Sequence, residues 1–573
     1  MHPLPPLTRL VGCLTRLTCL LDDLAATSGV IAGRTVHNYS GSDQSLGIIQ
    51  EWLSQCAKTH VDCLPDTALA FPETVAMSIS WRTQLPTRVI HVGTDSGNSP
   101  PFLHIPSIGE VGTYVTLSHC WGNSQPFTTT HATLFDRMSS IDINGLPKSF
   151  RDAITITRKI GIAYLWIDSL CIIQNDTRDW ERESAKMAEV YGNSYVTLAA
   201  TASPDGSKGM LFARDTKTKA VLQYPATNSS GSASDSSDLA SIIIMPAVMS
   251  LIDPLRRSPL NSRGWVVQER ILSKRIIHFN SDQIFWDCQQ KFLSEDGRYN
   301  ETISSGRYSR RNLNPKLLTS HGPDPKPTQQ THKSDDSIIA YWLAIVTEFS
   351  QKQLTVHADV FPALAGIASL VQKRLGDEYI AGMWRSDLHF ELLWTASEAP
   401  MRQAKEWRAP SWSWAANIGG ISYEYSHSLN EYTNSMTIVS VHTEWSARPM
   451  SSTLRHGYLV VEGILEEVSF NPESTMNHFY DTETFYLLPK GNDPDTKDGY
   501  NYSWAIFDFE PPSREITIYC LRVCTVDGGQ ENRVLLLQAT RRKENEFRRI
   551  GSGRIDKKPG TFGNGQMTLV SII

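Results

Sequence analysis

Long apolar runs are missing from this sequence of 573 residues. The stretch from Val11 to Leu21 is moderately apolar but contains Arg16, whereas a helix that spans a membrane needs about 20 apolar residues. A basic flank followed by an apolar signal-peptide core and a cleavage site is also missing from the N-terminus. We therefore expect no membrane span, a cytoplasmic protein, and a helix over 11–21.

An excess of positive charge is missing as well. The chain has 54 lysine and arginine residues against 60 aspartate and glutamate residues, and its net charge of −6 predicts no general attraction to nucleic acid or to an anionic membrane. No glycine-rich phosphate loop of the Walker type and no ankyrin or WD period occurs. The nine cysteines are scattered and odd in number, which favours a reducing compartment over a disulfide framework.

The stretch from 146 to 203 changes its period repeatedly. Apolar residues recur at helical spacing over 150–157, and an unbroken apolar run at 164–167 then ends at Asp168. A second helical stripe covers 180–191, and β-branched and small apolar residues follow. This order of helix, strand, helix, strand predicts an α/β domain with a layered core and a mostly parallel sheet.

Polar side chains follow two of the predicted strands. The first strand covers Tyr114 to Ser118, and the second is the run that ends at Asp168. Ligands of parallel sheets collect beyond the carboxyl ends of the strands, so we expect one crevice there. Its predicted lining is Ser118, His119, Cys120, Trp121, Gly122, Asp168 and Cys171.

Residues of hydrolases occur in this crevice, but their spacing argues against acyl transfer. His119 and Cys120 are neighbours, and neighbours on a strand point to opposite faces of the sheet. His119 could act as the base for Cys120 only if the chain turned sharply between them. A Gly-x-Ser-x-Gly elbow is also missing.

Three separate blocks resemble the hallmark motifs of the fungal heterokaryon incompatibility (HET) domain, in the order of that family. They are YVTLSHCWG at 114–122, the stretch 146–203, and SRGWVVQE at 262–269. The usual flanks of full-length HET proteins are similar to Trp52, Cys56, His60 and Cys63 before these blocks, and to the AGMW motif at 381–384 and RAPSWSWA at 408–415 after them. The resemblance implies a role in non-self recognition and programmed cell death, with another protein as the trigger. It leaves self-association open.

The third block also resembles part of TIR domains. On a helix, Trp265 and Glu269 lie one above the other on the same face, and Trp-x-x-x-Glu is similar to the TIR segment that carries an NAD-cleaving glutamate. Many TIR domains have the pattern Ser-x-Trp-Cys in this segment. In this chain Ser262 lies one position further from Trp265, and Val266 stands in place of the cysteine. The resemblance implies a TIR-like core, with NAD as substrate and Glu269 as the catalytic carboxylate.

The residue types of the third block suit this chemistry. Cleavage of the nicotinamide N-glycosidic bond builds positive charge on the ribose, which a fixed carboxylate stabilises. Trp265 or Trp121 could stack on a base, and the planar guanidinium of Arg263 could hold a phosphate.

Other interpretations of the same residues stay open. Trp265 could be a core residue, and Glu269 could form a structural ion pair with Arg263 or Arg270. The chain could then be a signalling or interaction module without catalysis. A HET-like enzyme that modifies a small molecule in a secondary-metabolite pathway is the third alternative.

One candidate metal motif lies near the N-terminus. Cys56, His60 and Cys63 share a helical stripe with Ile49 and Trp52, and Cys-x3-His-x2-Cys supplies zinc ligands. A structural zinc site normally has four ligands, and the neighbouring sequence shows no obvious fourth. Buried cysteine is common in cores, so we predict packing and no metal site.

Loops rich in serine or in proline and charge divide the chain, at 227–234 and 321–337. We expect a helical N-terminal flank and lead-in at 1–110, the HET domain at 111–320, a helical and tryptophan-rich module at 338–425, and a β-rich region at 426–573. The clustered tryptophans 384, 394, 407, 412 and 414 are expected to pack inside their module, because exposed clusters of such large rings are rare.

Overall fold

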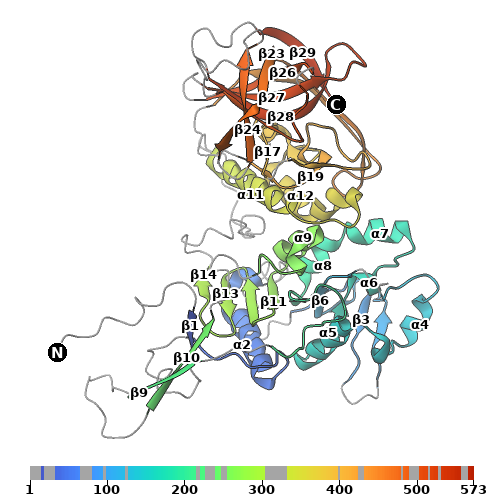
Figure 1. Cartoon of the computed structure of the whole chain (residues 1–573). Helices are drawn as coiled ribbons and strands as arrows, with labels where there is room; N and C mark the ends of the chain where they lie inside the picture. The colour runs from blue at the N-terminus through green and yellow to red at the C-terminus, as the bar shows by residue number, and fades with distance from the viewer. Residues whose placement is uncertain are drawn as a thin grey trace, which may run out of the picture. The chain divides into compact units, whose positions relative to one another are not determined.

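The computed structural model describes residues 15–18, 33–64, 81–94, 99–122, 127–214, 220–225, 239–246, 255–302, 332–397, 400–423, 432–478, 482–489, 503–513, 516–526, 531–556 and 565–573. The chain divides into two compact units, 1–316 and 317–573 (Figure 1). The predicted serine-rich loop at 227–234 lies outside the described residues. Of the predicted loop at 321–337, the part from His332 onward is helical. In the part of the chain that is described, no helix has both the length and the apolar character needed to cross a membrane.

A mixed sheet of nine strands organises the first unit, in the order β14-β13-β12-β11-β8-β6-β7-β3-β4. Its strands are β3 (Val89–His91), β4 (Phe102–His104), β6 (Tyr114–Ser118), β7 (Tyr164–Trp166), β8 (Val196–Ala199), β11 (Arg275–Phe279), β12 (Ile284–Cys288), β13 (Lys291–Ser294) and β14 (Asn300–Thr302). The pairings β11–β8, β8–β6 and β6–β7 are parallel. The strands of this parallel centre are buried, which explains why they appear in the sequence as unbroken apolar runs.

The α/β class is confirmed, but the prediction of a mostly parallel sheet is wrong. Antiparallel strands flank the parallel centre on both sides, at β14 to β11 and at β7 to β4. The links between β11 and β12 and between β12 and β13 contain only a few residues, which is enough for a hairpin but far too few for a parallel crossover. The TIR-like core stays a prediction.

The helices of this unit are α2 (Asp43–Thr59), α4 (Leu134–Ser139), α5 (Lys148–Lys159), α6 (Asp168–Cys171), α7 (Thr177–Ser184), α8 (Met187–Asn193) and α9 (Gly264–Leu272), with short 3-10 turns η2 (Val61–Cys63), η4 (Ile143–Gly145) and η5 (Leu260–Ser262). The predicted helix at 150–157 is α5, and Gly161 beyond its end takes a positive φ of 77°. The predicted helix at 180–191 is divided into α7 and α8. Near this break the hydroxyl of Ser184 donates to the carbonyl of Glu181, a local bond that competes with helical hydrogen bonding.

Short strands complete the first unit. They are β1 (Thr15–Thr18), β2 (Thr83–Gln84), β5 (Val111–Gly112), β9 (Ala220–Pro225) and β10 (Leu239–Pro246). The helix predicted over 11–21 is wrong at 15–18, because this segment pairs antiparallel with β10. A β-branched threonine stands at each end of β1, which suits a strand, and the pairing partner lies far away in the sequence.

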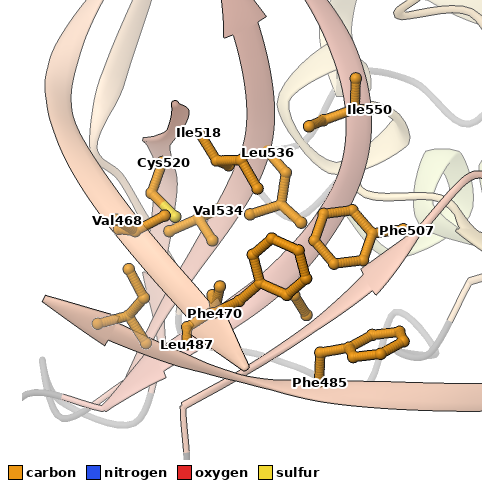
Figure 2. Close-up of a cluster of buried hydrophobic side chains, with 12 residues drawn as sticks. Val468, Phe470, Phe485, Leu487, Phe507, Ile518, Cys520, Val534, Leu536 and Ile550 are labelled. Carbon is orange, nitrogen blue, oxygen red and sulfur yellow. The ribbon is translucent and has the colours of Figure 1, made fainter. Parts of the chain in front are cut away.

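The second unit is β-rich at its C-terminal end, as predicted. The strands at this end are β22 (Met436–Trp445), β23 (Leu454–His478), β24 (Thr482–Pro489), β25 (Trp504–Phe507), β26 (Ile518–Val526), β27 (Glu531–Ala539), β28 (Glu546–Asp556) and β29 (Gln566–Ile572). Because β23 pairs with both β24 and β26, the pairings from β26 through β27, β28 and β25 back to β24 close into a ring. Figure 2 shows the buried side chains of this ring, among them Phe470, Phe485 and Phe507.

Helices and short strands precede this ring in the sequence. They are α11 (His332–Ser350), α12 (Ala365–Leu375), α13 (Leu388–Glu391), η6 (His357–Val360), η7 (Pro362–Leu364), η8 (Arg385–Asp387), η9 (Trp414–Ala416), β15 (Tyr379–Ile380), β16 (Met383–Trp384), β17 (Thr395–Ala396), β18 (Arg402–Gln403), β19 (Asn417–Ile418), β20 (Ile421–Ser422) and β21 (Thr433–Asn434). The tryptophans at 384, 394, 412 and 414 are buried as predicted, whereas Trp407 is 53% exposed.

Candidate functional site

Side chains from separate blocks of the sequence meet at the carboxyl ends of β6 and β7. The indole Nε1 of Trp121, just beyond β6, donates to Oδ2 of Asp168 at 2.9 Å. The guanidinium of Arg263, which precedes α9, donates to the backbone carbonyl of His119. The carboxyl ends of β6 and β7 therefore bring the three blocks together, whereas the crevice that we expect there stays a prediction.

Asp168 is both a structural and an accessible group. It opens the four-residue helix α6, and its Oδ1 accepts the backbone N–H of Ser169 at 2.7 Å. Nδ1 of His119 lies 3.8 Å from the same oxygen. The side chain of Asp168 is 23% exposed, so its carboxylate is accessible to a ligand.

His119 is a neutral imidazole at pH 7. Burial lowers its pKa to about 4, and the opposing effect of the Asp168 carboxylate is smaller. The ring packs edge-on against Phe150 of α5, with 5.0 Å between the ring centroids. His119 therefore serves as an uncharged wall of the site and not as a cation.

Glu269 is the most perturbed acid of the site. It lies on α9 with only 6% of its surface exposed, and burial raises its pKa to about 7, against the opposing charge of Arg263. The hydroxyls of Ser118 and Tyr191 are close enough to favour the charged form. Among the described residues, however, neither Oγ of Ser118 nor Oε2 of Glu269 has a hydrogen-bond partner of ordinary geometry. Perturbed acids with unsatisfied oxygens are typical of functional sites.

The space beside Glu269 is small. The cavity has a volume of about 10 Å³, and its polar lining comes from Ser118, Thr197, Asn261, Glu269, Arg270 and His278. A single water molecule needs roughly this much room. In the described arrangement, Glu269 is therefore closed to a molecule as large as a dinucleotide.

The two cysteines of the crevice are not activated nucleophiles. Cys120 belongs to an apolar cluster with Leu260 and Val266, and burial raises the pKa of its thiol. Burial also raises the pKa of the Cys171 thiol to about 12. A thiol needs a lowered pKa to react as a thiolate at pH 7, so neither residue supports acyl transfer.

The aromatic residues lie nearer the surface. Trp121 and Trp265 are half-buried, and Trp265 meets Trp180 of α7 edge-on, at 6.3 Å between ring centroids. Gly122 is exposed with a φ of 74°, and a Cβ there would lie 2.4 Å from Cβ of Asp205, so only glycine fits this turn.

One important residue was not identified from the sequence. Tyr191 on α8 is buried, its hydroxyl donates to the carbonyl of Leu117 at 3.4 Å, and it lies beside Glu269. In the sequence it is one apolar position of a helical stripe, and nothing in the stripe distinguishes a site residue from a core residue.

The interpretation of Glu269 as a partner in a structural ion pair has limited support. Nε of Arg270 lies 3.8 Å from Oδ2 of Asp287. Arg263 acts on Glu269 through its charge, and no direct ion pair of Glu269 occurs in the part of the chain that is described. The raised pKa fits a carboxyl group that lacks a close cationic partner.

A group that could hold a metal ion lies among other residues. Within the described ranges, one group has its ligand atoms close enough together to hold a metal ion. It consists of Cys56, His60, Cys63 and Cys288. The fourth of them, Cys288 at the end of β12, is far from the other three in the sequence.

Comparison with known proteins gives one result. Residues 114–269 match the family model described as Heterokaryon incompatibility protein (HET). No curated protein and no solved structure matches the chain. The matched segment begins with β6 and ends at Glu269, so it covers the three blocks that meet at the crevice. Over this segment the chain is similar to the heterokaryon incompatibility family.

Proposed function

We propose that this chain acts in heterokaryon incompatibility and cell death by hydrolysing the N-glycosidic bond of NAD, with Glu269 as the catalytic carboxylate. The HET domain at 114–269 supports the biological role. The observation that supports the reaction is the convergence of Trp121, Asp168 and Arg263 near one buried carboxyl group with a pKa of about 7. Another protein is the expected trigger.

In the proposed reaction, the bond between nicotinamide and the ribose C1 breaks, and its electron pair goes to the nicotinamide nitrogen. Water adds to C1 and loses a proton, which gives ADP-ribose, nicotinamide and a proton. Positive charge builds on the ribose in the transition state, and the ionised Glu269 stabilises it. Because this role needs the carboxylate, the rate should rise with pH as Glu269 ionises around pH 7.

Other residues of the site would position the substrate. Arg263 donates one N–H to the His119 carbonyl and also contacts the Cys120 thiol, and its planar guanidinium is suited to a phosphate. The half-buried rings of Trp121 and Trp265 are suited to stacking on a base. The cavity of about 10 Å³ must widen before NAD reaches Glu269, so the proposal includes an opening of the site.

The variant Glu269→Gln tests the proposal, because it keeps the shape of the side chain and removes its charge. Loss of such an electrostatic group commonly lowers a rate by roughly 10²–10³. We expect NAD cleavage by the purified full chain to fall by this factor, and growth arrest on overexpression to disappear. Glu181→Gln, on the exposed face of α7, is the matched control and should keep both activities.

The proposal fails if wild-type protein leaves NAD intact in the presence of its cell-death trigger, or if Glu269→Gln cleaves NAD at the wild-type rate. The closed cavity supports a second candidate, an interaction module of the HET family without catalysis. In that case Glu269→Gln should leave growth arrest unchanged while NAD levels stay normal. None of the described contacts favours the enzyme of a secondary-metabolite pathway.

A further inference from the structure

We propose that Cys56, His60, Cys63 and Cys288 bind a structural zinc ion. Their ligand atoms all lie within 4.8 Å of one another, and the four residues are buried. Three thiols and one imidazole form a recognised structural zinc set, and four protein ligands leave no open position for a substrate. The site is separate from the crevice of the HET domain, so this proposal does not depend on NAD cleavage.

Local structure brings three of the ligands together. Cys56 lies in the last turns of α2, and the backbone N–H of His60 caps that helix by donating to the Cys56 carbonyl at 3.0 Å. The chain then turns through η2, where the N–H of Cys63 donates to the His60 carbonyl at 3.1 Å. This helix end and turn present Cys-x3-His-x2-Cys to one point.

The fourth ligand comes from the sheet. Cys288 ends β12, and α2 packs against this strand, with Trp52 and Trp286 at 6.3 Å between ring centroids (Figure 1). A second contact lies just beyond these two elements, because Nε2 of Gln290, after β12, donates to Oδ2 of Asp62 in η2 at 2.6 Å. Cys288 therefore reaches the other ligands across a sequence separation of 228 residues from His60.

The spacing of the ligand atoms fits a tetrahedral ion. Zinc bonds of about 2.3 Å to sulfur and about 2.0 Å to nitrogen place the two ligand atoms about 3.5 Å apart at the tetrahedral angle. Sγ of Cys288 and Nδ1 of His60 lie 3.4 Å apart. The three cysteines are present as free thiols, so the observed cluster is not a disulfide.

The charge around the cluster also fits a metal ion held by thiolates. Arg275 is fully buried, and its Nε donates to Sγ of Cys56 at 3.2 Å. Its cation lies over Trp81 at 3.9 Å from the ring centroid, and among the described residues it has no carboxylate partner. A buried cation needs an anion nearby. Three thiolates and one Zn²⁺ carry a single net negative charge, which this guanidinium balances.

A backbone contact orients one of the sulfurs. The N–H of Lys291, which begins β13, donates to Sγ of Cys288 at 3.3 Å. Hydrogen bonds of this kind hold metal-bound thiolates in place. The turn between β12 and β13 thus supplies a ligand and a donor to it, in addition to the guanidinium on Cys56.

The metal content of the purified full chain tests this proposal. Protein prepared without chelator and under reducing conditions should contain about one zinc per chain by plasma mass spectrometry. Replacement of the zinc by Co²⁺ should give the visible absorption of a tetrahedral site and a thiolate charge-transfer band. Wild-type protein that holds no zinc and gives no cobalt spectrum would overturn the proposal, as would a disulfide among these cysteines in the reduced preparation.

Variants separate metal binding from simple packing. Cys288→Ser and His60→Ala should lose most of the bound zinc, whereas His60→Cys should retain it, because four thiolates also form a zinc site. Cys520→Ser is the matched control, since Cys520 is buried in the second unit, and it should keep the full content. Full zinc content in soluble Cys288→Ser protein would contradict the assignment of the fourth ligand. Loss of zinc in His60→Cys would contradict the assignment of His60.

Discussion

At the scale of single residues, Glu269 and His119 show opposite pKa shifts with one cause. Burial disfavours the charged form of each, which raises the pKa of the acid to about 7 and lowers that of the base to about 4. Between these values both side chains are mostly uncharged. Near neutral pH, the carboxyl group of Glu269 can therefore gain or lose its charge, whereas the imidazole of His119 stays neutral.

This shift makes the stability of the protein depend on pH. The folded-state pKa of Glu269, about 7, lies above its ordinary value of 4.5. The folded state therefore holds the proton more tightly than the unfolded state does. The favourable contribution is complete below the ordinary pKa and is lost as the pH rises through 7. The shift corresponds to a loss of roughly 3 kcal/mol.

We predict that Glu269→Gln gains stability relative to wild type as the pH rises from about 5 to about 8, because glutamine has no charge to bury. The free energy of unfolding in urea, measured across this range for both proteins, gives the difference. His119 titrates equally in both proteins, so its own acid-side effect cancels. If the difference in the free energy of unfolding stays constant with pH, burial does not raise the pKa of Glu269.

At the scale of elements, local patterns predicted the centre of the fold and missed its edges. The predicted bounds agree with the structure to within about two residues for the helix at 150–157 and for the strands at Tyr114–Ser118 and 164–167. Each of these elements is amphipathic or fully buried along its own length, so its own sequence pattern predicts it. The pairing of 15–18 with β10 depends on distant partners. A periodic pattern in one segment contains no information about such a partner.

The parallel order of the strands made part of the site predictable. Residues after β6 and β7 do meet, as the Trp121–Asp168 bond shows, because the parallel order fixes where strand ends lie. Cys288 was not linked to Cys56 and Cys63, since only the pairing of β11 with β12 and the docking of α2 bring it there. The spacing of residues within one motif does not predict contacts between segments that are far apart in the sequence.

Between elements, one buried ion pair ties α7 to the segment before β3. Nη2 of Arg88 lies 2.5 Å from Oδ2 of Asp179, and its Nε donates to the Cys171 carbonyl at 2.6 Å. The N–H of Ile173 donates to the same Asp179 oxygen at 2.8 Å. Both charged side chains are nearly fully buried. Asp179 also pairs through its other oxygen with Arg182, which is exposed, whereas Asp179 is the carboxylate that meets the buried Arg88.

We predict that Asp179→Ala destabilises the first unit by roughly 3–5 kcal/mol, because it leaves a buried guanidinium without its anion. Urea unfolding followed by tryptophan fluorescence measures the change. Glu181→Gln, two residues further on the exposed side of α7, should change stability by less than about 0.5 kcal/mol. A loss for Asp179→Ala as small as that of the control would show that water or another group replaces the carboxylate.

At the scale of the whole molecule, each compact unit has its own sheet and its own buried residues. The unit at 1–316 contains the nine-stranded sheet, the HET domain and the proposed zinc ligands. The unit at 317–573 contains the ring of strands around the phenylalanine cluster. A unit with its own core can in principle fold alone.

We predict that a fragment of residues 1–316 folds by itself and that removal of metal lowers its melting temperature. Zinc binding contributes to folding whenever the unfolded chain lacks a formed site, and here the ion would join segments that are 228 residues apart. Calorimetry of the fragments 1–316 and 317–573, with and without a strong chelator, checks this. The chelator should lower the transition of 1–316 by many degrees and leave that of 317–573 unchanged, because all four proposed ligands lie in the first. If 1–316 unfolds at the same temperature with and without chelator, the four side chains contribute packing alone. If 317–573 responds instead, the stabilising metal lies elsewhere in the chain.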